Sequence, residues 1–150
     1  GGTDPETAQP YATPTIYNAT YIGTSSKLTF RDNAGGTYAN SILLIKQIDI
    51  EDLASGEDSR NRLENGELTI GENVIDAATK IIDSNDGDLT GHANVATQST
   101  TSTGITTANP VPAIAVSATG LSSDSFIDNV SYKGAFSSSN WAQGWTRSFQ

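Results

Sequence analysis

An alternation of polar and apolar residues is the clearest signal in this sequence, and it recurs three times. The segments 27–33, 47–53 and 67–73 each begin with the order polar, apolar, polar, apolar, and they are evenly spaced along the chain. A period of two is typical of a β-strand with one buried face. The shared inward positions are Leu28, Ile48 and Leu68, followed by Phe30, Ile50 and Ile70.

The segments between these predicted strands keep the same spacing. Residues 18–22 precede the similar residues 38–42 by one such interval, and residues 58–62 are a third, far more polar copy that is alternatively a loop. A repeat of about 20 residues with two or three short strands is typical of one coil of a parallel β-solenoid. The alternative is a meander of hairpins, with a tight turn at Asn65-Gly66. Equal spacing of like side chains favours stacked coils, because these build a continuous core.

Four further stretches refine this prediction. Residues 33–36, Asn-Ala-Gly-Gly, lie between two predicted strands, where a coil needs a corner with positive φ. After Asn73 the apolar residues recur at spacings of one, three and four, which predicts a short helix ending near Asp83. Residues 97–109 are rich in Thr and Ser and read as a surface loop, and residues 113–116 as another strand.

Several segments resemble a known family. Residues 14–23 and 28–42 resemble coils of large secreted right-handed parallel β-helix proteins of Bacteroidetes and other marine bacteria. Residues 126–136 and 141–146 resemble the C-terminal signature of those proteins, whereas residues 77–113 match nothing in them. The resemblance implies the C-terminal part of such a protein, with its closing cap, exposed at the cell surface or secreted. It implies no activity.

The predicted fold is therefore all-β, a right-handed parallel β-helix with a loop-rich C-terminal cap. We expect β-helix coils over residues 1–76, a loop-rich insertion with a short helix over 77–112, and terminal strands with an aromatic cap over 113–150. Because the chain starts at Gly1-Gly2 without Met, we expect a processed part of a longer protein, with any signal peptide upstream.

Composition narrows the classes of function. The 150 residues include no Cys, which excludes disulfides, a thiol nucleophile and thiolate metal sites. The net charge of −9 disfavours binding to nucleic acid or anionic membrane. No apolar run approaches the roughly 20 residues of a membrane helix.

The sequence gives little evidence for a catalytic site. His92, the only histidine, lies in a predicted loop without a nucleophile-elbow pattern, so we expect an exposed loop residue. Glycoside hydrolysis needs two carboxylates, but Asp49 and Glu51 project from an outer strand face, where acidic side chains are usually only solvated. The motifs of pectin-cleaving β-helix hydrolases are absent. The other carboxylates considered are Asp52, Glu64 and Glu67.

Two groups remain as candidate binding sites. Asp83, Asn85, Asp86 and Asp88 surround Gly87 and offer oxygen ligands to Ca²⁺, although their spacing is not that of an EF-hand and an acidic turn is favoured. No other cofactor is expected. The second group is aromatic and comprises Tyr132, Trp141 and Trp145, with Phe136 beside them. These rings would stack on sugar rings if they are exposed. Alternatively they would plug the open end of the solenoid, and their position near the C-terminus favours this second role.

These observations predict a non-catalytic structural or adhesive module of a secreted or cell-surface bacterial protein. Its open end would stack on upstream coils or on another copy of the chain, and copies stacked in this way would form an extracellular filament. A carbohydrate-binding module that recognises polysaccharide is one alternative. A polysaccharide lyase or hydrolase is the other.

Overall fold

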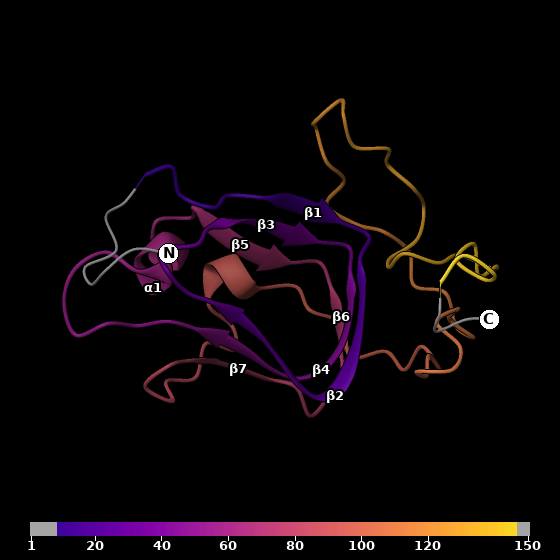
Figure 1. Ribbon diagram of the computed structural model, residues 1–150, viewed down its shortest axis with the longest axis horizontal. Coiled ribbons are helices and arrows are strands. Elements are labelled where there is room, and N and C mark those ends of the chain that lie inside the picture. The colour runs from indigo at the N-terminus through magenta and orange to yellow at the C-terminus, as the bar shows by residue number, and fades with distance from the viewer. Residues whose placement is uncertain (1–8, 147–150) are drawn as a thin grey trace.

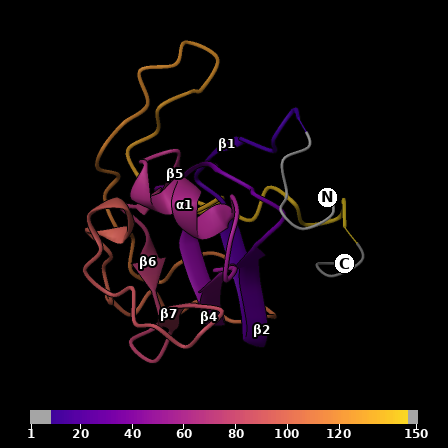
Figure 2. The ribbon, with the colours of Figure 1, turned by 90° about the vertical axis from the view of Figure 1, so that its left-hand side faces the viewer.

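The computed structural model describes residues 9–146, which form two small parallel sheets (Figure 1). One sheet has the order β1-β3-β5, and the other has the order β2-β4-β6 with β7 also paired to β4 (Figure 2). The elements are β1 (Thr15–Tyr17), β2 (Thr20–Phe30), β3 (Gly36–Ala39), β4 (Ile42–Ile50), α1 (Ser59–Glu64), β5 (Leu68–Gly71), β6 (Val74–Ile75), β7 (Lys80–Asp83) and the 3₁₀ turn η1 (Ala93–Val95).

The predicted β-helix is wrong, because the sheets are small, do not close and do not repeat evenly. Thr15 of β1 pairs with Thr37 of β3, and Thr37 pairs on its other side with Thr69 of β5. The stretch of chain between the second pair is clearly longer than the stretch between the first pair. The longer stretch arises because α1 and its flanking loops lie between β4 and β5. The result is a mixed arrangement, mostly strands with one short helix, rather than a solenoid.

The expected stack of Leu28, Ile48 and Leu68 is correct for only one of its two contacts. Leu28 of β2 pairs with Ile48 of β4, but Ile48 pairs on its other side with Ile81 of β7. Leu68 instead pairs with Gly36 in the other sheet. The even spacing seen in the sequence therefore holds only along the second half of the β2–β4 pair, after a bulge between Gly23 and Lys27.

The main core lies between the two sheets and is mostly aliphatic. Burying such side chains stabilises the fold by about 1.5–3 kcal/mol each. Tyr38 packs edge-on against Phe30, with ring centroids 4.8 Å apart. The buried members are Phe30, Leu43, Ile45, Ile48, Ile50, Leu63, Leu68, Ile70, Ile75, Ile81, Leu89 and Val95.

Residues in the left-handed backbone conformation, with positive φ, turn the chain from one sheet to the other. Asn18, Asn40 and Glu72 have φ of 55°, 50° and 57° at the ends of β1, β3 and β5. Asparagine tolerates this conformation better than most residues. The predicted corner at residues 33–36 is confirmed, with φ of 58° at Asn33 and 105° at Gly36. A Cβ at Gly36 would lie 2.2 Å from the Pro14 carbonyl oxygen, so only glycine fits there.

Helix α1 replaces the weak third copy of the repeat. Asp58 begins it with a capping box, since its Oδ1 accepts the Asn61 amide at 2.7 Å while the Asn61 side chain accepts the Asp58 amide. Leu63 is buried, which fixes the helix to the core. The helix predicted for residues 74–83 is also wrong, because that stretch forms β6 and β7.

The two edges of the sheets differ. Residues 89–99 cover one edge: the Leu89 amide bonds to the Ile81 carbonyl, and the Ser99 amide bonds to the Asn73 carbonyl. Among residues 9–146, no strand pairs with the outer sides of β1 and β2. The strand expected at residues 113–116 is absent, and residues 96–146 contain only isolated bridges.

A short segment around Lys133 joins the C-terminal part to the sheet corners. The Gly134 amide donates to the Asn40 carbonyl at 2.7 Å, and the Asn18 side chain donates to the Tyr132 carbonyl at 2.5 Å. Lys133 is buried, and its Nζ donates to the Glu72 carbonyl and, at 2.9 Å, to Thr119 Oγ1. This segment therefore holds three successive corners together.

Candidate functional site

The two tryptophans of the chain, both strongly exposed, lie in the C-terminal turns. Trp141 is 63% exposed, yet its ring is held in place. It stacks on the buried ring of Phe136, with centroids 5.4 Å apart and planes 19° apart. Its indole N–H donates to the Ala135 carbonyl at 2.7 Å. One face of the indole is therefore fixed against the protein.

Local hydrogen bonds shape the turns that carry this ring. Asn140 Oδ1 accepts the Ala142 amide at 3.1 Å, and the Trp145 amide donates to the Ala142 carbonyl at 3.1 Å. Ala142 is buried, whereas Trp145 is 87% exposed. The sequence therefore places two tryptophans close together on consecutive turns that face solvent.

The expectation that the tryptophans plug the fold is not met. Phe136 takes the buried position, and Trp141 and Trp145 lie outside. Tyr132 is half-buried, and its backbone serves the corner contacts around Lys133. Within the predicted sugar-stacking set, Trp141 and Trp145 are thus the strongly exposed members. Sequence reasoning missed Phe136 as the support of the stack, because spacing alone does not show which ring of a cluster is buried.

The acidic run 83–88 is a tight turn. Asp83 Oδ1 accepts the amides of Asn85 and Gly87 at 3.0 and 2.8 Å, and Asp88 Oδ1 accepts the Thr90 amide at 2.9 Å. Over residues 9–146 there is no group of three or more His, Cys, Asp or Glu side chains that could hold a metal ion. Calcium binding by Asp83, Asn85, Asp86 and Asp88 stays a prediction without geometric support.

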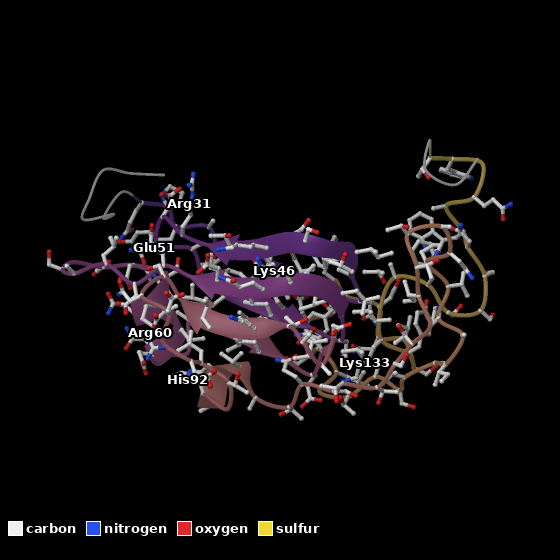
Figure 3. All side chains as sticks on the ribbon, turned by 90° about the horizontal axis from the view of Figure 1, so that it is seen from below. Arg31, Lys46, Glu51, Arg60, His92 and Lys133 are labelled. Carbon is white, nitrogen blue, oxygen red and sulfur yellow. The ribbon has the colours of Figure 1, made fainter. Side chains whose placement is uncertain are left out.

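His92 has a local structural role. Its Nδ1 accepts the Asn94 amide at 3.2 Å, which caps η1, and its Nε2 lies 3.1 Å from Glu64 Oε2. The hydrogen bond from His92 lowers the pKa of Glu64, with help from the neighbouring Arg60. Figure 3 shows Arg60 and His92 close together at the end of the molecule that carries α1.

The carboxylates considered for hydrolysis serve separate contacts. Asp49 Oδ2 pairs with Lys27 Nζ at 3.2 Å, and Glu51 Oε2 accepts the Asp32 amide at 2.8 Å. Glu67 Oε2 accepts Arg62 Nη1 at 2.5 Å. The structure therefore divides these carboxylates among ion pairs and loop contacts on different elements.

A polar cleft of 410 Å³ lies beside α1, and sequence reasoning did not identify it. Its members come from several separate parts of the chain, so no local motif signals it. Arg62 crosses the cleft, and its guanidinium carbon lies 3.9 Å from the centre of the Tyr11 ring. The lining residues are Gln9, Tyr11, Asn33, Glu57, Asn61, Arg62, Asn65 and Glu67.

Comparison with protein-family models, with curated proteins and with solved structures gives no match. The resemblance to secreted β-helix proteins thus stays a prediction from the residues. No helix among residues 9–146 has the length and apolar character that crossing a membrane requires.

Proposed function

We propose that this chain is a non-catalytic adhesive module of a secreted or cell-surface bacterial protein, and that it holds polysaccharide by stacking a sugar ring on Trp141. One observation carries the proposal: Trp141 is fixed by Phe136 and by its indole hydrogen bond, yet 63% of it remains exposed. An indole that is held in one orientation and left exposed offers a flat aromatic face to a ligand.

The support behind Trp141 matters for affinity. A sugar ring presents a flat face of C–H groups, which suits contact with a flat aromatic ring. Because the indole is already immobilised, binding loses little side-chain entropy. Trp145, on the next turn, offers a second ring to a neighbouring sugar of the same polymer. It has no comparable support among the described residues, so we expect a smaller contribution from it.

The charge of the chain favours a neutral polymer. The net charge of −9 repels polyanions at long range, including nucleic acid and acidic polysaccharide. Neutral polysaccharide meets no such barrier. Sugar stacking is also insensitive to salt, which suits adhesion outside the cell.

Affinity electrophoresis tests the proposal, with gels that contain xylan, β-glucan, mannan or pectin. At least one neutral polymer should retard the wild type, and Trp141→Ala should weaken this binding about tenfold or more. Phe126→Ala is the matched control, because Phe126 is 93% exposed and removal of its ring should leave binding unchanged. Equal retardation of the Trp141→Ala variant, or release of reducing ends from the polymer, would contradict a non-catalytic tryptophan site.

A structural role in assembly is the second candidate, and the open edge of β2 favours it. The Phe30 carbonyl accepts the Glu51 amide and thus faces β4, so the N–H and C=O of Thr29 point to the open side. Exposed edges of this kind pair readily with other strands. Because residues 89–99 cover the opposite edge, two copies joined at β2 would form a closed pair rather than a filament.

Sedimentation at increasing protein concentration tests this second candidate. The wild type should associate into dimers. Thr29→Pro should remain monomeric, because proline removes an outward N–H without removing a bond to β4, and Thr29→Ala should behave like the wild type. A monomeric wild type at every concentration would exclude assembly through this edge.

A further inference from the structure

The polar cleft beside α1 lies apart from the Trp141 turns. Figure 1 places α1 and the C-terminal turns at opposite ends of the molecule. Its volume of 410 Å³ is within the range of about 300–1,000 Å³ that is usual for small-molecule sites. We propose that this cleft binds one uncharged pyranose residue.

Arg62 organises the cleft through two hydrogen bonds, a longer ion pair and a ring contact. Its Nε donates to Asn33 Oδ1 at 2.7 Å, and its Nη1 donates to Glu67 Oε2 at 2.5 Å. Glu57 Oε2 lies 3.9 Å from Nη2. The guanidinium also stacks on Tyr11, and only 13% of the Arg62 side chain is exposed.

These contacts exclude an acidic sugar. A uronate carboxylate would have to displace Glu57 or Glu67 from Arg62. It would also be repelled by these two carboxylates, whereas only one guanidinium would attract it. Glu57 is ionised at neutral pH, since hydrogen bonds from Tyr11 and Asn33 lower its pKa. Among the described residues that line the cleft, the single cation, Arg62, is therefore already neutralised by two carboxylates.

The remaining hydrogen-bonding groups match hydroxyl groups. Glu57 and Glu67 engage Arg62, Tyr11 and Asn33 through Oε2, so among residues 9–146 no hydrogen bond uses Oε1 of either side chain. The side chains of Gln9 and Asn65 also form no hydrogen bond with the described residues. Carboxylate oxygens accept from sugar hydroxyls, and amides both donate and accept. Acceptors and donors arranged in this way can bind several hydroxyl groups of one pyranose ring.

Sugar binding in this cleft goes beyond the Trp141 proposal and does not depend on it. ¹H–¹⁵N correlation spectra of the full chain provide the test, in titrations with cellotriose, xylotriose, mannotriose, maltotriose, trigalacturonate and tetralysine. At least one neutral trisaccharide should shift the amides of residues 61–67. The same shifts should appear in the Trp141→Ala variant, which would separate this site from the tryptophan site.

Substitutions of exposed side chains sharpen this test without disturbing Arg62. Asn65→Ala and Gln9→Ala should each weaken binding of that trisaccharide about three- to tenfold, as expected for one lost hydrogen bond. Gln143→Ala is the matched control, because Gln143 is exposed and lies in the C-terminal turns. Unchanged affinity in both cleft variants would overturn the proposal.

A change of ligand preference is the most specific outcome. Glu67→Gln removes one of the two carboxylates that neutralise Arg62 and should raise affinity for trigalacturonate about tenfold relative to the wild type. Dispersed spectra would show that the variant is folded. The proposal is wrong if no neutral trisaccharide shifts residues 61–67 in the wild type, or if trigalacturonate or tetralysine is the preferred ligand.

Discussion

Ile48 in β4 and Ile81 in β7 are paired in register in neighbouring parallel strands, and both side chains are buried. The helix α1 and the strands β5 and β6 separate them along the chain. Their contact joins the first long strand pair, β2–β4, to the last strand of the fold. Because Leu28 lies on the other side of Ile48, the centre of the core depends on this residue.

Replacement of Ile48 by alanine should therefore lower the free energy of unfolding by about 2–5 kcal/mol, through loss of apolar contact and formation of a cavity. Urea unfolding followed by circular dichroism measures this change. Lys46→Ala is the control in the same strand, since Lys46 is exposed and should cost less than about 0.5 kcal/mol. Similar costs for the two variants would mean that Ile48 is not at the centre of the core.

The sequence predicted individual strands better than their arrangement. Polar–apolar alternation correctly identified the strand residues around Leu28, Ile48 and Leu68, because burial of one face is a local property. Which strands become neighbours depends on the length of the connections. The insertion of α1 moved Leu68 to the other sheet and made Ile81 the partner of Ile48, and no periodicity reports such a shift.

The capping box of α1 explains how this short segment remains helical among strands. Asp58 Oδ1 accepts the Asn61 amide, and its Oδ2 accepts the Leu53 amide at 2.6 Å. Asp58→Ala should destabilise the protein by about 1–2 kcal/mol. Asp128→Ala, at an exposed loop position, is the control in the same thermal unfolding experiment. Equal midpoints for the two variants would rule out a role for the cap.

The contact between Glu64 and His92 predicts a pH effect of known sign. The pKa of Glu64 in the folded state is lower than its ordinary value of 4.5, so this group stabilises the fold above that value. The contribution is lost as the pH falls through the lowered folded-state value. Glu64→Gln should therefore flatten the decline of the urea midpoint between about pH 6 and about pH 3.

The effect should be modest, because the Glu64 side chain is 49% exposed and solvent screens the pair. His92→Gln should flatten the profile in the same way, since it removes the main cause of the shift. A variant profile parallel to that of the wild type would show that the contact does not persist in solution.

Lys133 should determine how firmly the C-terminal part docks. Lys133→Met keeps the apolar stem but removes the donor to the Glu72 carbonyl and to Thr119 Oγ1. We expect a loss of about 1–3 kcal/mol and faster hydrogen exchange of the Gly134 amide, which bonds to the Asn40 carbonyl. Lys80→Met, at an exposed position, should change neither quantity. Unaltered exchange at Gly134 in the Lys133 variant would contradict this role.

The two candidate sites differ in how far the sequence reveals them. Trp141 and Trp145 stood out because large aromatic rings among polar residues are unusual, although only the structure shows that Phe136 takes the buried place. The cleft at Arg62 left no signal, because Tyr11, Asn33 and Glu67 come together only through the fold. Sites assembled from distant segments are invisible to spacing arguments.

Fluorescence of Trp141 reports whether a sugar ring stacks on this indole. The chain has two tryptophans, so Trp145→Phe leaves Trp141 as the only indole reporter. Titration with soluble xylan, β-glucan and mannan should produce a saturable change in its emission with at least one polymer, because a stacked sugar displaces water from the exposed face. Sugar binding at Trp141 is contradicted if no polymer changes the emission, or if Trp141→Phe, which reports only from Trp145, binds the same polymer with equal affinity.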